Sequence, residues 1–207
     1  MKALFTLFAA VCLMAGVAVA QDTWCYGWED GGTMLGAYLP DDMYIANTEA
    51  QAFEGTHSLE IYEIGATGTP QAYVAWITGL HEGDQVTASI MTLDMITGNP
   101  SCRIWGHWTT AGGTIDDYAG SASGNSTYSG TGEEWIELSY TWTAGAAQEG
   151  QGLVVEIRPY NASPWAGSNW IDNLCVTKPV DAWLYFPGTG PVGTDNQSWS
   201  SVKALFD

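Results

Sequence analysis

The side chains best suited to chemistry lie in two segments, CRIWGHWT and GLVVEIRPY. Side chains of an extended strand alternate between its two faces, so each segment directs every second residue to one side. The outward residues are Arg103, Trp105, His107, Glu156, Arg158 and Tyr160. Aromatic rings pack on the C–H faces of a pyranose, and Arg and Glu side chains bond its hydroxyl groups. These residues therefore predict a surface that binds a sugar.

Two further tryptophans are expected at the border of this surface. Trp76 in QAYVAWIT falls on the face opposite Tyr73, and Trp165 lies in the loop SPWAGSN. The chain has a formal charge of -18, from 23 acidic and 5 basic residues, and this charge disfavours a long polyanion as ligand. A neutral or sparsely charged polysaccharide is the expected partner.

The arginines allow a second ligand chemistry and also a plainer explanation. Arg103 and Arg158 could hold a uronic carboxylate through paired hydrogen bonds. Alternatively, Arg103 only pairs with Glu156 across neighbouring strands, and Trp105 covers a sheet edge. The sequence leaves these alternatives open.

Catalysis has weaker support. A glycoside hydrolase needs two carboxyl groups about 5–10 Å apart, and the two segments offer only Glu156 on the outward face. A polysaccharide lyase could use His107 and Tyr160, with the arginines neutralising charge. No G-x-S-x-G, H-E-x-x-H or phosphate-loop motif is present. We expect no catalytic residue, with lyase or hydrolase activity as an alternative.

The N-terminus has the features of an export signal. Met1 and Lys2 precede an apolar run, and AVA before Gln21 matches the small-x-small pattern of a cleavage site. Residues 1–20 are therefore expected to be a signal peptide, and the mature chain to be secreted or displayed at the cell surface. A retained N-terminal anchor is the alternative. Loss of Lys2 would change the charge from -18 to -19. Nucleic acid and anionic membranes are then poor partners, because both need a basic patch, and no membrane insertion is expected after cleavage.

Short β-rich segments separated by clusters of Gly, Asn, Pro and Asp predict an all-β fold. The expected strands are residues 25–29, 58–62, 71–78, 85–93, 102–109, 135–143, 152–160 and 170–177. No helical period of useful length appears between Gln21 and Lys178. Short strands at this spacing predict a two-sheet sandwich.

The composition changes after Lys178. PVDAWLYFPGTGPVGTDNQS is rich in Pro and Gly, which predicts a linker over residues 179–198. The remaining C-terminal segment contains an amphipathic stretch, WSSVKALF, at residues 199–206. Three alternatives stay open for this stretch: a helical turn that docks on the body, a tag read by a secretion or surface-attachment apparatus, or a disordered end.

Five separated pieces of the chain form an ordered set. They are WEDG (28–31), EGTHSLEI (54–61), ITGLHEGDQVTASI (77–90), EEWIELSYTWTA (133–144) and WIDNLCV (170–176). In order and spacing they resemble the jelly-roll carbohydrate-binding modules of secreted bacterial proteins, within the galactose-binding-like sandwiches. The resemblance implies a jelly-roll β-sandwich over residues 21–178 that binds polysaccharide. A structural or adhesive cell-surface sandwich without a sugar site is the alternative.

The resemblance also implies a structural calcium ion where the first and last strands meet. By this likeness its ligands would be Glu29, Asp172 and backbone carbonyls around Thr56 and His57. Calcium takes six to eight oxygens and accepts both carboxylates and main-chain carbonyls, so the set is chemically suitable. The alternative is that Glu29 and Asp172 are only exposed acids at strand ends.

Three cysteines remain after removal of residues 1–20, and export would permit a disulfide. If Glu29 lies opposite Asp172 in an antiparallel pair, Cys25 falls one residue from the position opposite Cys175. A disulfide needs Cα atoms within about 7 Å. This register therefore predicts a Cys25–Cys175 bond, with Cys102 as a free, buried thiol.

Overall fold

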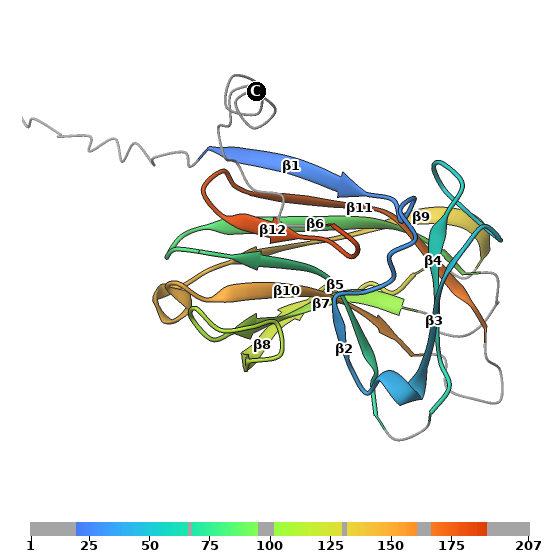
Figure 1. Cartoon of the computed structure of the whole chain (residues 1–207), viewed down its shortest axis with the longest axis horizontal. Coiled ribbons are helices and arrows are strands. Elements are labelled where there is room, and N and C mark those ends of the chain that lie inside the picture. The colour runs from blue at the N-terminus through green and yellow to red at the C-terminus, as the bar shows by residue number, and fades with distance from the viewer. Residues whose placement is uncertain (1–19, 66–67, 95–101, 130–131, 161–166, 190–207) are drawn as a thin grey trace, which may run out of the picture.

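Two antiparallel β-sheets form the fold in the computed structural model, which describes residues 20–65, 68–94, 102–129, 132–160 and 167–189 (Figure 1). The strands of the first sheet are β1 Gln21–Tyr26, β3 Met43–Thr48, β4 Ser58–Glu63, β6 Gln85–Asp94, β9 Gly132–Thr143 and β11 Asn169–Pro179. Their order is β3-β4-β11-β6-β9, and β1 pairs with β11.

The second sheet carries the two chemically rich segments. Its strands are β2 Gly36–Tyr38, β5 Gln71–Thr78, β7 Cys102–Thr109, β8 Tyr118–Gly124, β10 Gly152–Pro159 and β12 Trp183–Tyr185. Their order is β12-β5-β10-β7-β8, and β2 pairs with β5. The predicted all-β, two-sheet jelly-roll sandwich is thus confirmed.

The core lies between the sheets and follows from the alternation of side chains. Ile104 on β7, with Leu153 and Ile157 on β10, is fully buried, and burial of each such side chain contributes about 1.5–3 kcal/mol. Gly106 makes room for Trp142, which comes from β9 of the other sheet. A Cβ at Gly106 would lie 3.2 Å from the Trp142 indole, so a larger residue would require the Trp142 ring to move.

β11 is the central strand of the first sheet and pairs with strands on both sides. β6 pairs along one edge, while β4 and β1 share the other edge, and a bulge interrupts the ladder between Asp172 and Cys175. Cys25 and Cys175 are directly opposite and form a disulfide, with Cα atoms 4.1 Å apart. The predicted disulfide is confirmed, and Cys102 is free and buried as expected.

The register of β1 differs from the expected one. β1 ends at Tyr26, so Glu29 lies beyond the strand and is not paired with Asp172. Instead Asp22 is opposite Lys178, whose fully buried Nζ lies 2.9 Å from the Asp22 Oδ1 atom. The expected strand over residues 25–29 therefore begins after the observed start of β1 at Gln21. The predicted position of Cys25 relative to Cys175 differs from the observed one by only one residue.

Four strands were not predicted: β2, β3, β8 and β12. β12 falls within residues 179–198, which were expected to be a linker, and it pairs with β5. Leu184 is fully buried and Phe186 is 3% exposed. The folded body therefore extends beyond Lys178 to at least Phe186, because Leu184 and Phe186 of the run WLYF pack on the core despite the Pro and Gly residues nearby.

Several expectations fall outside the described residues. They concern the expected signal peptide up to residue 19, Trp165 and the amphipathic stretch at residues 199–206. The helices that the structure does describe are the short 3-10 turns η1 Pro40–Asp42 and η2 Ala146–Gln148. Neither has the length and apolar character that a membrane span requires.

Candidate functional site

Strands β7 and β10 are neighbours, and their register joins the two chemically rich segments into one surface. Their cross-strand pairs include Arg103–Arg158, Trp105–Glu156 and His107–Val154. Residues between these pairs, such as Ile104 and Ile157, are buried in the core. Both strands therefore turn their polar and aromatic groups toward the outer face of the second sheet.

At one end of this face, the arginines are held against aromatic rings. The Arg103 Nε donates a hydrogen bond to the Tyr160 hydroxyl at 2.7 Å. The Arg103 guanidinium carbon lies 4.4, 4.9 and 5.2 Å from the ring centroids of Trp105, Tyr160 and Tyr128, and that of Arg158 lies 4.6 Å from Trp105. Such cation–π contacts contribute about 0.5–1 kcal/mol at exposed sites. We call Arg103, Trp105, Tyr128, Arg158 and Tyr160 the arginine–aromatic cluster.

Glu156 supports this cluster from below the surface, because it is completely buried. Its Oε2 accepts a hydrogen bond from the Arg158 Nε at 2.7 Å, and its Oε1 lies 2.5 Å from the Nδ1 of buried His107. With its amide nitrogen turned toward the carboxylate, Gln71 also donates to Glu156. Among the described residues Glu156 therefore pairs with Arg158 rather than with Arg103, which was the pairing considered from the sequence.

A β-bulge adds Tyr73 to the same face. The pairing of β10 with β5 shifts between Val155 and Glu156, which places Tyr73 opposite Glu156. The Tyr73 ring lies 4.9 Å from the His107 imidazole, and burial, aided by the charge of Glu156, raises the pKa of Tyr73 to about 12. The expectation that Tyr73 and Trp76 face opposite sides is therefore wrong, because a bulge interrupts strict alternation.

Aromatic rings close the middle of this face. The Tyr118 ring, which is 65% exposed, lies 5.5 Å from the His107 imidazole, whereas His107 itself is 2% exposed. A ligand on this face would therefore meet Tyr118 and the arginine–aromatic cluster, with His107 and Glu156 beneath them.

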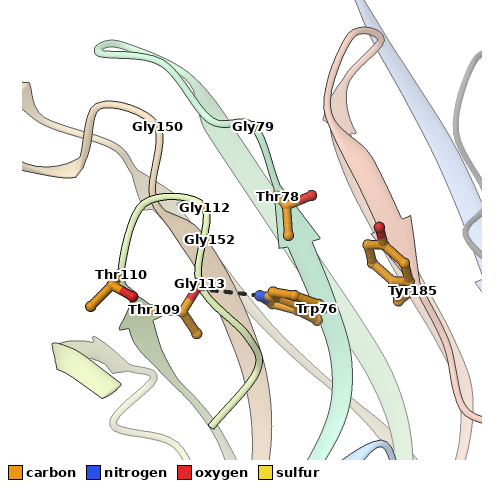
Figure 2. Close-up of a pocket in the computed structure, with 10 residues that line it drawn as sticks. All are labelled: Trp76, Thr78, Gly79, Thr109, Thr110, Gly112, Gly113, Gly150, Gly152 and Tyr185. Carbon is orange, nitrogen blue, oxygen red and sulfur yellow. Dashed lines mark hydrogen bonds between the residues drawn. The ribbon is translucent and has the colours of Figure 1, made fainter. Parts of the chain in front are cut away.

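Trp76 lies toward the opposite end of the face and borders a pocket of about 310 Å³ (Figure 2). Its indole Nε1 donates to the Thr109 hydroxyl at 3.4 Å, and its ring centroid is 5.1 Å from that of Tyr185 on β12. β7 rises about 3.3 Å per residue, so Arg103 and Thr109 are about 20 Å apart along the strand. The structure thus brings six of the expected site residues together and leaves Trp76 apart from them.

Glu29 is held by the turn that precedes β4. Its Oε1 accepts hydrogen bonds from the backbone N–H groups of Thr56 and His57, each at 2.9 Å, and its Oε2 accepts one from the Thr56 hydroxyl. These bonds lower the pKa of Glu29 to about 2. Gly55 has φ 68°, and a Cβ there would lie 2.2 Å from the carboxylate, so the turn can close on Glu29 only with glycine at this position.

Asp172 lines a pocket of about 400 Å³ together with Glu29 and Glu54. Its Oδ2 accepts hydrogen bonds from the backbone N–H groups of Phe53 and Glu54, and burial raises its pKa. The pocket offers carboxylates to a cation, but the turn presents N–H groups rather than carbonyls to Glu29. Within the described ranges, no three His, Cys, Asp or Glu side chains are arranged to hold a metal. The residues fit calcium only in part.

Four tyrosines at this face were not singled out from the sequence: Tyr73, Tyr118, Tyr128 and Tyr185. Tyr128 follows a stretch of Gly and Ser residues whose composition signals a turn. Tyr118 begins β8, which the sequence did not predict. Tyr185 lies in the apolar run WLYF, the one signal that could have revealed β12.

No protein-family model matches this chain, and no curated protein sequence matches it. Its structure is similar to the CBM22-1 xylan-binding domain from Paenibacillus barcinonensis Xyn10C, with 16% identity, a TM-score of 0.50 and coverage of 78% of this chain and 97% of that domain. It is also similar to the CBM22-1-CBM22-2 tandem domain of Xyn10C, with 17% identity, a TM-score of 0.51 and coverage of 79% of this chain and 48% of the tandem. The chain therefore has the jelly-roll fold of the CBM22 carbohydrate-binding domains.

Proposed function

We propose that this chain is a secreted, non-catalytic module that binds a neutral or sparsely charged polysaccharide at the arginine–aromatic cluster. The observation that carries the proposal is the contact of two guanidinium groups, from Arg103 and Arg158, with the Trp105 ring on one outer sheet face. Fixed rings and planar cations present rigid apolar area beside hydrogen-bond donors, which is the combination that a pyranose needs. Because the similar CBM22-1 domain is named as xylan-binding, xylan is the first polysaccharide to test.

The pairing of the arginines supports a ligand with little negative charge. In the described part of the chain, Arg158 has a carboxylate partner, whereas no carboxylate lies within ion-pair distance of Arg103. Arg103 can therefore accept an occasional uronic carboxylate through paired hydrogen bonds. The charge of -18 would repel a continuous polyanion.

The position of Glu156 supports binding rather than catalysis. A glycoside hydrolase needs two carboxyl groups about 5–10 Å apart around the scissile bond. Glu156 is fully buried and engaged by Arg158 and His107, so a glycosidic oxygen cannot reach it in this arrangement. A lyase needs an accessible base, and His107, one of the two candidates, is sealed with Glu156.

Affinity electrophoresis in gels containing xylan, cellulose or mixed-linkage glucan tests this function. Arg103→Ala and Tyr128→Ala should each weaken binding about tenfold or more, which corresponds to a loss of about 1.4 kcal/mol. Tyr44→Ala is a matched control, because Tyr44 is 39% exposed and lies on β3 of the other sheet. This control should bind as the unmodified protein does.

Other outcomes point to the alternatives. If the unmodified protein binds no polysaccharide, the sandwich is structural or adhesive and the proposal fails. If binding persists in both cluster variants, the ligand lies elsewhere on the molecule. Release of reducing sugar, or of unsaturated sugar, from any polysaccharide would indicate an enzyme.

Export and calcium binding are part of the same proposal. β1 begins at Gln21, directly after the expected cleavage site, so removal of residues 1–20 leaves the strand whole. N-terminal sequencing of the exported protein should therefore start at Gln21. Calcium would be held by the Glu29 and Asp172 carboxylates and would supply a positive charge that links these segments. Backbone oxygens near Thr56 and His57 would join them only if the turn, whose N–H groups now face Glu29, rearranged.

A further inference from the structure

The pocket beside Trp76 has the properties of a ligand site in its own right. Its lining residues are Trp76, Thr78, Gly79, Thr109, Thr110, Gly112, Gly113, Gly150, Gly152 and Tyr185. We propose that this pocket is a second saccharide-binding site that takes a neutral pyranose ring. It extends the proposed polysaccharide binding to a separate place on the molecule, and it can be present or absent independently of the arginine–aromatic cluster.

Two aromatic side chains, Trp76 and Tyr185, line the pocket. Trp76 and Tyr185 are cross-strand partners on β5 and β12, with ring centroids 5.1 Å apart and planes tilted by 31° (Figure 2). Trp183 lies on the same side of β12, because Leu184 between them is buried, and it is 41% exposed at the edge of the sheet. Aromatic surface thus continues from the pocket to the sheet edge, where it offers apolar faces to the C–H groups of a sugar.

The polar groups of the pocket are uncharged. Thr78, Thr109 and Thr110 line it. The Thr78 and Thr110 hydroxyls can each donate and accept a hydrogen bond, whereas Thr109 is 1% exposed and its hydroxyl accepts the Trp76 indole N–H. None of the ten lining residues is ionisable near neutral pH, although the chain has 23 acidic residues. A site that combines hydroxyl groups and aromatic rings, with no ionisable lining residue, is suited to a neutral sugar rather than to an ion.

Five of the ten lining residues are glycines. A Cβ on Gly152 would lie 2.5 Å from the Thr109 hydroxyl and 2.6 Å from the Trp76 Nε1, so glycine at this position lets the Trp76 and Thr109 side chains meet over β10. A Cβ on Gly79 or Gly112 would meet no atom within 4 Å, which leaves their backbone accessible. The volume of about 310 Å³ is at the small end of the range of about 300–1,000 Å³ for ligand pockets, as a single sugar ring requires.

The pocket is separated from the arginine–aromatic cluster by closed surface. Val154 is fully buried and His107 is 2% exposed. These two paired residues therefore form no accessible groove between the pocket and the arginine–aromatic cluster. Both ends nevertheless lie on the outer face of one sheet. A long polysaccharide that contacts both would bind more tightly than either site alone, because the second contact is intramolecular.

Titration with methyl β-xylopyranoside and methyl β-glucopyranoside, observed through the tryptophan indole N–H resonances, tests the proposal. The Trp76 resonance, assigned by its loss in Trp76→Phe, should shift on addition of at least one glycoside. Tyr185→Ala, and Gly152→Ala, whose methyl group would displace the Trp76 ring, should each weaken this binding about tenfold or more. Tyr185→Phe keeps the ring and should bind normally, and dispersed amide resonances will show that each variant is folded.

These measurements distinguish failure of the second-site proposal from failure of the proposed binding at the arginine–aromatic cluster. Arg103→Ala should leave the Trp76 shift unchanged even if it abolishes polysaccharide binding at the cluster. A folded protein whose Trp76 resonance does not move with either glycoside overturns the second site. Unchanged glycoside affinity in both Tyr185→Ala and Gly152→Ala overturns it as well, whatever the arginine variants show.

Discussion

The Glu156 carboxylate is buried in the protein and contacts two residues of the outer face, Arg158 and His107. It is fully buried, and it accepts a hydrogen bond from Arg158 while lying against His107. A buried charge is tolerated only when its partners compensate it. Glu156 therefore positions the Arg158 guanidinium beside Trp105, where a ligand can reach it.

Glu156→Gln should lower the free energy of unfolding by about 3–5 kcal/mol, the usual cost of breaking a buried ion pair. The substitution keeps the shape of the side chain but removes the charge that Arg158 and His107 face. Urea denaturation measures the loss. Glu137→Gln on the exposed face of β9 is the control and should change stability by about 0.5 kcal/mol or less. Equal effects in the two variants would show that the buried charge is not needed.

At the scale of elements, the turn at residues 54–57 couples folding to the titration of Glu29. Hydrogen bonds from His57 and Thr56 lower the pKa of Glu29 from 4.5 to about 2, so the unfolded chain binds the proton at higher pH than the folded protein does. The stability from this group is fully present above about pH 4.5 and is lost as the pH falls toward 2. Glu29→Gln should flatten this part of the profile in thermal melts. Identical acid profiles for the two proteins would contradict the assignment.

Calcium binding would affect the same elements, because Glu29 is one of its proposed ligands. If one ion binds, calcium at 100 times its dissociation constant should raise the free energy of unfolding by about 2.7 kcal/mol. EDTA should therefore lower the melting temperature, and added calcium should restore it. Asp172→Asn should remove this response. A melt that EDTA does not change would rule out the ion.

The central strands could be predicted from the sequence because their signals are local. The bounds of β5 and β7 match the predicted ones, since β-branched and aromatic runs end there at Gly, Pro or turn residues. β8 has the sequence YAGSASG, which is typical of a turn. It forms a strand because β7 supplies its partner, and such tertiary pairing overrides a weak intrinsic preference.

The candidate site could be predicted only in part. Alternation placed Arg103, Trp105 and Arg158 on one face, because both strands are regular there. It could not reveal that Tyr73 joins them, since a bulge depends on how two distant strands pair. It also could not show that Glu156 is sealed, because the rings that cover this face come from other strands.

For the whole molecule, the Cys25–Cys175 bond joins strands separated by 150 residues in sequence. A cross-link across so long a loop restricts the unfolded chain, and its loss should lower the free energy of unfolding by about 3–5 kcal/mol. A double variant, Cys25→Ser with Cys175→Ser, measures this in urea. Reductant should destabilise the unmodified protein and leave the double variant unchanged. Comparable stability of the oxidised protein and the double variant would show that the bond contributes little.

The position of β12 decides where this module can be cut. β12 covers the edge of β5 from Trp76 to Thr78 and supplies Tyr185 to the pocket. A recombinant fragment that stops after β11 would uncover backbone amides at that edge, and an exposed edge is a template for pairing with a second copy. Fusion partners should therefore be joined downstream of Phe186, or the product will tend to aggregate through β5.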